Sequence, residues 1–93
     1  MPTFTSQQRR LWSDMIEAVA RYRAGAVSFS QMVGALEGAL DAGEFEDTDL
    51  RRRWYDLWTP LEIARATTGN ETKLDDIEEH LSKMDNFLKA ATE

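Results

Sequence analysis

The sequence contains no cysteine, which excludes two kinds of small protein. Neither a disulfide framework nor a zinc site with thiolate ligands can form without it. The absence fits a reducing compartment, and we expect a cytoplasmic protein. The chain also lacks an apolar run approaching the roughly 20 residues that span a bilayer. Its first residues lack the apolar core of a signal peptide. We therefore expect no membrane partner.

Histidine is almost as scarce, and the motifs of common enzyme classes are missing. His80 is the single histidine, and Ile77 stands where a Glu-x-x-His metal pair needs a carboxylate. We expect His80 to be solvated. The sequence has no phosphate-binding glycine loop and no G-x-S-x-G motif. Neighbouring acids such as Asp75 and Asp76 diverge by about 100° on a helix, so they form no acid–base pair. We predict a non-enzymatic protein without metal or cofactor.

The net charge of −6 lies entirely in residues 44–93, which carry thirteen acidic and seven basic side chains. A negative half repels phosphate, so we expect neither nucleic acid nor anionic lipid as a partner. The same charge attracts a basic protein. The alternative is an acidic surface that only keeps the protein soluble.

Apolar residues recur at intervals of three and four in four segments, at about residues 6–24, 29–42, 49–67 and 72–91. This spacing places apolar side chains on one face of a helix. No segment alternates as a strand does, and short loops make neighbouring helices antiparallel. The sequence predicts one domain over residues 1–93, an all-α, compact four-helix bundle with up-and-down connections.

Local start and stop signals support these segments. Two pairs have the spacing of a capping box, in which each side chain accepts from the other residue's backbone: Thr5 with Gln8 and Ser28 with Gln31. Gly25 stands where a left-handed cap would end the first helix, and Gly43 is expected to end the second. Asp47 or Thr48 can cap the third. The fourth is expected to begin at about Thr72.

The third segment contains Pro60, which removes a backbone donor and crowds the preceding turn. Thr59 to Glu62 also has the pattern of a helix start, with threonine as cap, proline first and glutamate third. The third helix is therefore either kinked or split at Pro60. We favour a kinked but continuous helix, because Ala64 extends the apolar face of Leu61.

Arg51–Arg53 are three consecutive arginines followed by Trp54, a mixture that suggests a nucleic-acid surface. On a helix they fan out by about 100° per residue, so they form no basic stripe. Asp49 and Asp56 each stand four residues from one of these arginines, within reach of an ion pair. The apolar residues of this segment share one face and are predicted to be core: Trp54, Leu57, Trp58 and Leu61. Nucleic-acid binding is therefore the weakest interpretation.

The acidic loop Glu44–Asp49 is the main candidate for a protein-binding site. It carries four carboxylates around Phe45, which we expect to be exposed. Arg51 and Tyr55 lie one turn apart beside the core stripe, and such side chains often anchor interfaces. The candidate protein-binding residues are Glu44, Phe45, Glu46, Asp47, Asp49, Arg51 and Tyr55.

Two further features would serve as seams of a homodimer. Gly34 and Gly38, with alanines beside them, could let another helix approach closely; a merely weak helix is the alternative. The fourth segment repeats apolar residues from Leu74 to Leu88 in the manner of an a/d heptad. Self-association therefore stands beside a separate protein partner.

In the middle of the chain, Tyr22–Gly25 leads into the capped Ser28–Ser30 segment, and Trp58, Leu61 and Glu62 follow further on with a W-x-x-L-E spacing. With these motifs, which span about half of its length, the chain resembles small helical proteins encoded beside bacterial toxins, the immunity-protein type. The resemblance implies an inhibitor that binds a basic nuclease toxin through acids such as Glu44, Glu46, Asp47 and Asp49. The neutral first 43 residues depart from a uniformly acidic inhibitor. The sequence thus predicts a small bacterial interaction domain. The alternatives are a homodimeric structural or regulatory protein and, weakest, an enzyme or metal protein.

Overall fold

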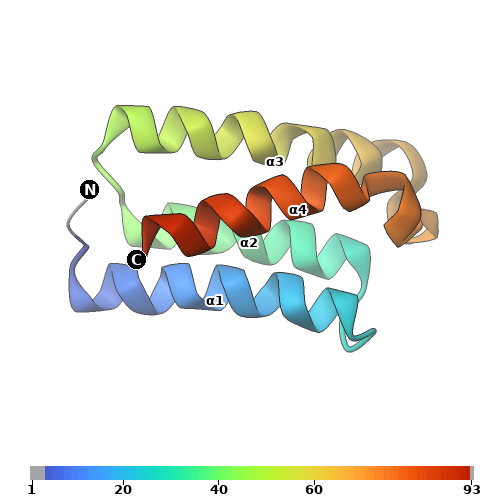
Figure 1. The fold of residues 1–93 in the computed structure, drawn as a ribbon, viewed down its shortest axis with the longest axis horizontal. Helices are drawn as coiled ribbons and strands as arrows, with labels where there is room; N and C mark the ends of the chain where they lie inside the picture. Colours follow the sequence, from blue (N-terminus) through green and yellow to red (C-terminus); the bar gives the residue numbers. More distant parts are fainter. Residues whose placement is uncertain (1–3, 93) are drawn as a thin grey trace.

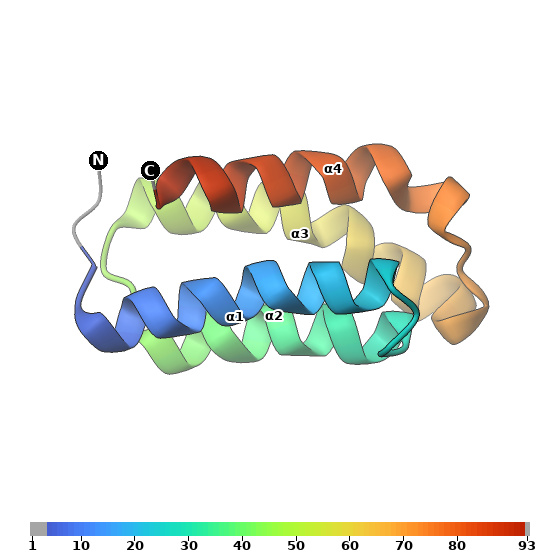
Figure 2. The same cartoon turned by 60° about the horizontal axis from the view of Figure 1, so that its bottom comes forward.

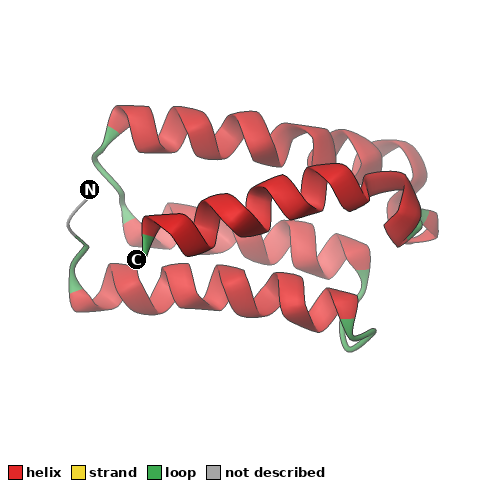
Figure 3. Cartoon of the chain, in the orientation of Figure 1, coloured by secondary structure: helices red, strands yellow, loops and turns green. Residues whose placement is uncertain are grey.

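The computed structural model describes residues 4–92, and every regular element in this range is a helix (Figures 1 and 3). In chain order the elements are α1 (Ser6–Arg23), α2 (Phe29–Gly43), α3 (Thr48–Thr68), the short 3₁₀ helix η1 (Gly69–Glu71) and α4 (Leu74–Ala91). The bounds of the main helices differ from the predicted ones by at most two residues. The apolar period therefore predicted both their number and their extent.

Each main helix packs against its neighbour in the chain, and α4 packs back onto α1. Neighbouring helices run in opposite directions (Figures 1 and 2). The α2–α3 loop therefore lies at the same end of the bundle as the start of α1 and the end of α4 (Figure 1). This arrangement confirms the predicted all-α, up-and-down four-helix bundle.

Tryptophan side chains tie the helices together. Trp12 of α1 is fully buried, and its indole Nε1 donates to the Leu88 carbonyl of α4 across 2.7 Å. Trp58 of α3 donates to the Val33 carbonyl of α2 across 3.2 Å. Each bond joins two different helices, so it fixes their relative position while the ring fills the core. The four predicted core residues of α3 all pack in or against the core: Trp54, Leu57, Trp58 and Leu61.

The ends of α1 and the start of α2 follow the predicted signals, whereas the end of α2 does not. Both capping boxes are present at the starts of α1 and α2. After α1, Gly25 has a φ of +78°, and the Ala26 N–H donates to the Arg21 carbonyl across 2.8 Å, a helix end that glycine favours. The stop predicted at Gly43 is wrong by one residue. Gly43 is the last helical residue, and Glu44 takes the left-handed conformation with a φ of +48°.

α4 begins two residues later than predicted. Thr72, the expected start, is buried instead, and its hydroxyl bonds to that of Thr68 and, across 3.3 Å, to the Ala64 carbonyl. These bonds hold Thr72 against the end of α3. In η1, which connects α3 to α4, the Asn70 Oδ1 accepts from the Ser30 N–H across 2.9 Å. This bond satisfies a free donor in the first turn of α2.

α3 continues through Pro60 as one helix, so the start signal at Thr59 is not used. Instead of capping a new helix, the Thr59 hydroxyl donates to the Tyr55 carbonyl one turn back, across 2.7 Å. Proline and this kind of hydroxyl bond both bend helices. The ribbon of α3 changes direction in its second half (Figure 2). The kinked but continuous path is the one observed.

Candidate functional site

The loop Glu44–Asp47 joins α2 to α3 and is fixed at both ends. The Glu44 N–H donates to the Asp41 carbonyl across 3.3 Å and closes the last turn of α2. Of the two predicted caps, Asp47 is the one that caps α3, because its carboxylate accepts from the Leu50 N–H across 3.0 Å. The loop therefore presents its acidic side chains from a backbone that both flanking helices define.

Phe45 is buried, with 3% of its surface exposed, so the prediction of an exposed Phe45 is wrong. Its ring lies edge-on to those of Trp12 and Phe4, at centroid distances of 5.4 Å and 5.3 Å. It also covers Gly43, where a Cβ would fall 2.2 Å from a ring carbon. The Phe45 ring thus closes the end of the core and faces inward.

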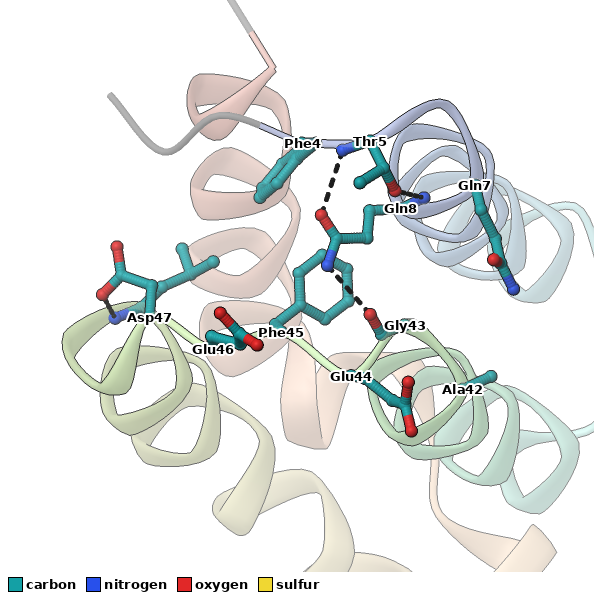
Figure 4. Close-up of a pocket in the computed structure, with 11 residues that line it drawn as sticks. Phe4, Thr5, Gln7, Gln8, Ala42, Gly43, Glu44, Phe45, Glu46 and Asp47 are labelled. Carbon is teal, nitrogen blue, oxygen red and sulfur yellow. Dashed lines mark hydrogen bonds between the residues drawn. The ribbon is translucent and has the colours of Figure 1, made fainter.

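A cavity of about 520 Å³ opens between this loop and the segment that leads into α1 (Figure 4). Gln8 links the two walls. Its Nε2 donates to the Gly43 carbonyl across 2.9 Å, while its Oε1 accepts from the Thr5 N–H across 3.0 Å. A second cavity of about 560 Å³ shares Glu44 and Glu46 with the first. The two glutamates therefore border both hollows.

Asp49 has its charge matched by its own helix. Its carboxylate lies 2.6 Å from Arg52 and 3.3 Å from Arg53. The hydrogen bond from Arg52 lowers the pKa of Asp49 below its ordinary value. The predicted pair with Arg53 is thus present, whereas Asp56 forms no ion pair with Arg52 among the described residues. Asp49 therefore has less charge to offer a partner than its position in the sequence indicates.

Glu44 and Glu46 are the loop acids whose charge remains unmatched. Both are exposed, and neither forms an ion pair within residues 4–92. Asp47 is also exposed, but its carboxylate is engaged in capping α3. Figure 4 shows the side chains of all three on the loop side of the cavity. The negative potential of the loop therefore centres on Glu44 and Glu46.

Arg51 and Tyr55 occupy different surroundings. Arg51 is exposed and lines the second cavity. Tyr55 is half-buried, with its ring edge-on to Trp54 and Trp58 at 5.0 Å and 5.9 Å, and it borders neither cavity. Most of the candidate residues therefore gather around the two cavities, whereas Asp49 and Tyr55 lie outside them. The gathered residues are Glu44, Phe45, Glu46, Asp47 and Arg51.

Sequence reasoning missed three residues at the surface. Phe4 and Gln8 belong to the cavity wall. Gln8 was expected only as a capping partner, and no local signal connects it with a carbonyl that lies 35 residues away. Ile63 is 60% exposed, the only large hydrophobic side chain so exposed in residues 4–92. The exposure of Ile63 could have been predicted from the helical period, because a residue two places after the core residue Leu61 points about 160° away from it.

The chemistry that this surface offers is negative charge beside aromatic rings. Within residues 4–92 no group of three His, Cys, Asp or Glu side chains is placed to hold a metal ion, and His80 is exposed as predicted. No helix in the described range is both long and apolar enough to cross a bilayer.

No protein-family model, curated protein or solved structure matches the chain. The surface itself is therefore the basis for a functional proposal.

Proposed function

We propose that this chain is a non-enzymatic protein-interaction domain that binds a basic protein through Glu44 and Glu46. The observation that carries the proposal is that both carboxylates are exposed beside cavities and form no ion pair within residues 4–92. Binding a cation there breaks no ion pair seen in the fold. Opposite charge also speeds association and selects among partners. An immunity-type inhibitor of a basic toxin in the bacterial cytoplasm is the sharpest form of this proposal.

The flanking charges support the same surface in different ways. Asp47 and Asp49 make internal hydrogen bonds but lie next to Glu44 and Glu46, so their carboxylates add to the negative potential at longer range. Arg51 stands at the edge of the second cavity, where an arginine can pair with an acidic side chain of the partner. A basic partner with one acid at its rim would fit both features.

A double charge reversal tests the proposal. We expect Glu44→Lys with Glu46→Lys to weaken binding of a decalysine peptide by at least about tenfold at low salt. The unmodified protein should itself lose affinity as salt rises, because salt screens exposed charges. Isothermal titration calorimetry measures both effects. The control reverses Glu71 and Glu79, which are exposed and belong to η1 and α4 rather than to the loop. Equal losses in the two variants would show that only net charge matters.

The toxin form of the proposal has its own test. We expect a gene directly beside the one for this chain to encode a basic protein, and its purified product to bind in the same assay. The Glu44/Glu46 reversal should weaken that complex more than the Glu71/Glu79 control does. A neighbouring product that does not bind contradicts the toxin form.

A homodimer is the second candidate, and the surface of α2 favours one seam over the other. Gly34 and Gly38 are exposed, and a Cβ at either position would meet no atom within 4 Å. The heptad face of α4 is instead buried in the core, through Ile77, Leu81, Met84 and Leu88. We expect Gly38→Leu to block close approach on α2 and to lower the mass measured by light scattering. A monomer mass for the unmodified protein at every concentration would contradict this candidate.

A further inference from the structure

Phe4 stands just before the capped start of α1 and is attached to the bundle through its ring. The ring centroid lies 5.1 Å from that of Trp12 and 5.3 Å from that of Phe45. Neither the N–H nor the carbonyl of Phe4 forms a backbone hydrogen bond within residues 4–92. Displacing the Phe4 side chain therefore breaks ring contacts and no backbone hydrogen bond in that range.

The two rings beneath Phe4 form an aromatic seat. Trp12 comes from α1 and Phe45 from the α2–α3 loop, and their centroids are 5.4 Å apart. Both are almost wholly buried, whereas Phe4 is half-buried. Phe4 is thus the outermost ring of the three and lies between the other two and solvent. Its own position shows that a phenyl group fits this seat.

The seat adjoins the acidic surface. Phe4, Phe45 and Leu50 line the 520 Å³ cavity together with the acids of the loop. Figure 4 shows the Phe4 ring on one wall, with Glu46 and Asp47 across the opening. A ligand that reaches the loop carboxylates is therefore beside Phe4 as well. Charge complementarity selects a basic segment, and the seat selects an aromatic side chain within it.

We propose that Phe4 is an intramolecular plug, which occupies the seat on Trp12 and Phe45 until an aromatic side chain of a basic partner replaces it. This inference rests on the proposed function and adds that the partner segment carries an aromatic residue among its Lys or Arg residues. An incoming ring restores the contacts that Phe4 gives up. The plug thereby keeps the aromatic seat covered in the free protein and lowers the apparent affinity for the partner.

Two capped peptides and two variants test the plug. The peptides are Lys-Lys-Phe-Lys-Lys and Lys-Lys-Ala-Lys-Lys, compared by calorimetry. If the seat is open in a tenth of the molecules, Phe4→Ala should tighten binding of the phenylalanine peptide by about tenfold. The matched control is Phe87→Ala. Phe87 is also half-buried and packs on Trp12 at 6.1 Å, but it does not line the cavity. We expect no gain in this control, and none for the alanine peptide with either variant.

Replacing Phe4 by a larger aromatic residue should have the opposite effect on binding. Phe4→Trp should weaken binding of the phenylalanine peptide, and this variant decides the question if Phe4→Ala loses its helical circular dichroism. Equal affinity of the unmodified protein and Phe4→Ala, or an equal gain for both peptides, overturns the plug. The Glu44/Glu46 reversal separates the two proposals. If it weakens binding of both peptides while Phe4→Ala changes nothing, the acidic surface stands and the plug fails. If neither peptide binds, both fail.

Discussion

At the scale of single residues, two glycines of α2 differ in whether packing requires them. A Cβ at Gly43 would fall 2.2 Å from the ring of Phe45, whereas a Cβ at Gly38 would meet no atom within 4 Å. Gly43 therefore allows Phe45 to close the core. Nothing in the described fold requires Gly38, which costs the helix about 1 kcal/mol relative to alanine. Comparing the two positions therefore distinguishes the effect of packing on stability from the effect of helix propensity.

Replacing each glycine by alanine should change stability in opposite directions. We expect Gly43→Ala to lower the free energy of unfolding by about 1–3 kcal/mol, because the added methyl displaces the Phe45 ring. Gly38→Ala should raise it by about 0.5–1 kcal/mol through helix propensity alone. Urea unfolding followed by circular dichroism measures both. A gain of equal size in the two variants would contradict the packing of Phe45 on Gly43.

The tryptophans offer a second matched pair. Trp12 and Trp54 are both fully buried, but only Trp12 has a partner for its indole N–H, whereas Trp54 Nε1 has none among the described residues. Losing a bond to a buried carbonyl costs about 1–3 kcal/mol. Trp12→Phe should therefore destabilise the protein by about 1–2 kcal/mol more than Trp54→Phe does. Equal losses in urea unfolding would mean that the Leu88 carbonyl finds another donor.

At the scale of elements, the sequence predicts helices well because their signals are local. Apolar spacing sets the face that a helix buries, and capping boxes set its start within a few residues. Phe45 follows the end of α2, where the helical period no longer applies, so its direction could not be predicted. The same holds for Thr72, whose bonds run back to the end of α3. The acidic loop was found from composition, but its pairing with Phe4 and Gln8 depends on tertiary contact.

The ion pair between α1 and α4 predicts a pH dependence. Arg23 lies 2.9 Å from Glu78, which also accepts from the Ser82 hydroxyl across 2.8 Å. The Ser82 bond first, and then the Arg23 bond, lower the pKa of Glu78 below its ordinary value of 4.5. The stability from this carboxylate is therefore present above about pH 4.5 and is lost as the pH falls through the lower, folded-state pKa.

Glu78→Gln tests this linkage. We expect the variant to be less stable than the unmodified protein at neutral pH, and the difference to shrink as the pH falls below that ordinary value, because protonation of Glu78 removes the same charge. Urea unfolding across the acid range measures the difference. Asp49 and Glu62 also have lowered pKa values, so the variant still loses stability in acid. A difference that stays constant with pH would contradict the linkage through Glu78.

At the scale of the whole molecule, antiparallel connections bring distant parts of the sequence together at the acidic end. The start of α1 and the α2–α3 loop meet there, joined by Gln8 and by the rings of Phe4, Trp12 and Phe45. The charge of the surface thus comes from one loop, while its aromatic part is built from two regions of the chain. The charge of the loop can be recognised from the sequence alone, whereas the grouping of the aromatic rings requires the fold.

The same connectivity predicts that the molecule unfolds as one unit. Trp12 lies in α1 and Trp54 in α3, yet both belong to one core that all four helices share. Loss of either helix exposes the side chains that hold the others, so partly folded forms should be scarce. We expect tryptophan fluorescence and circular dichroism to give the same urea midpoint. Trp12→Phe restricts the fluorescence to α3, and Trp54→Phe with Trp58→Phe restricts it to α1. In each variant the two methods should again coincide, and helical signal that persists after the α3 fluorescence is lost would show separate folding units.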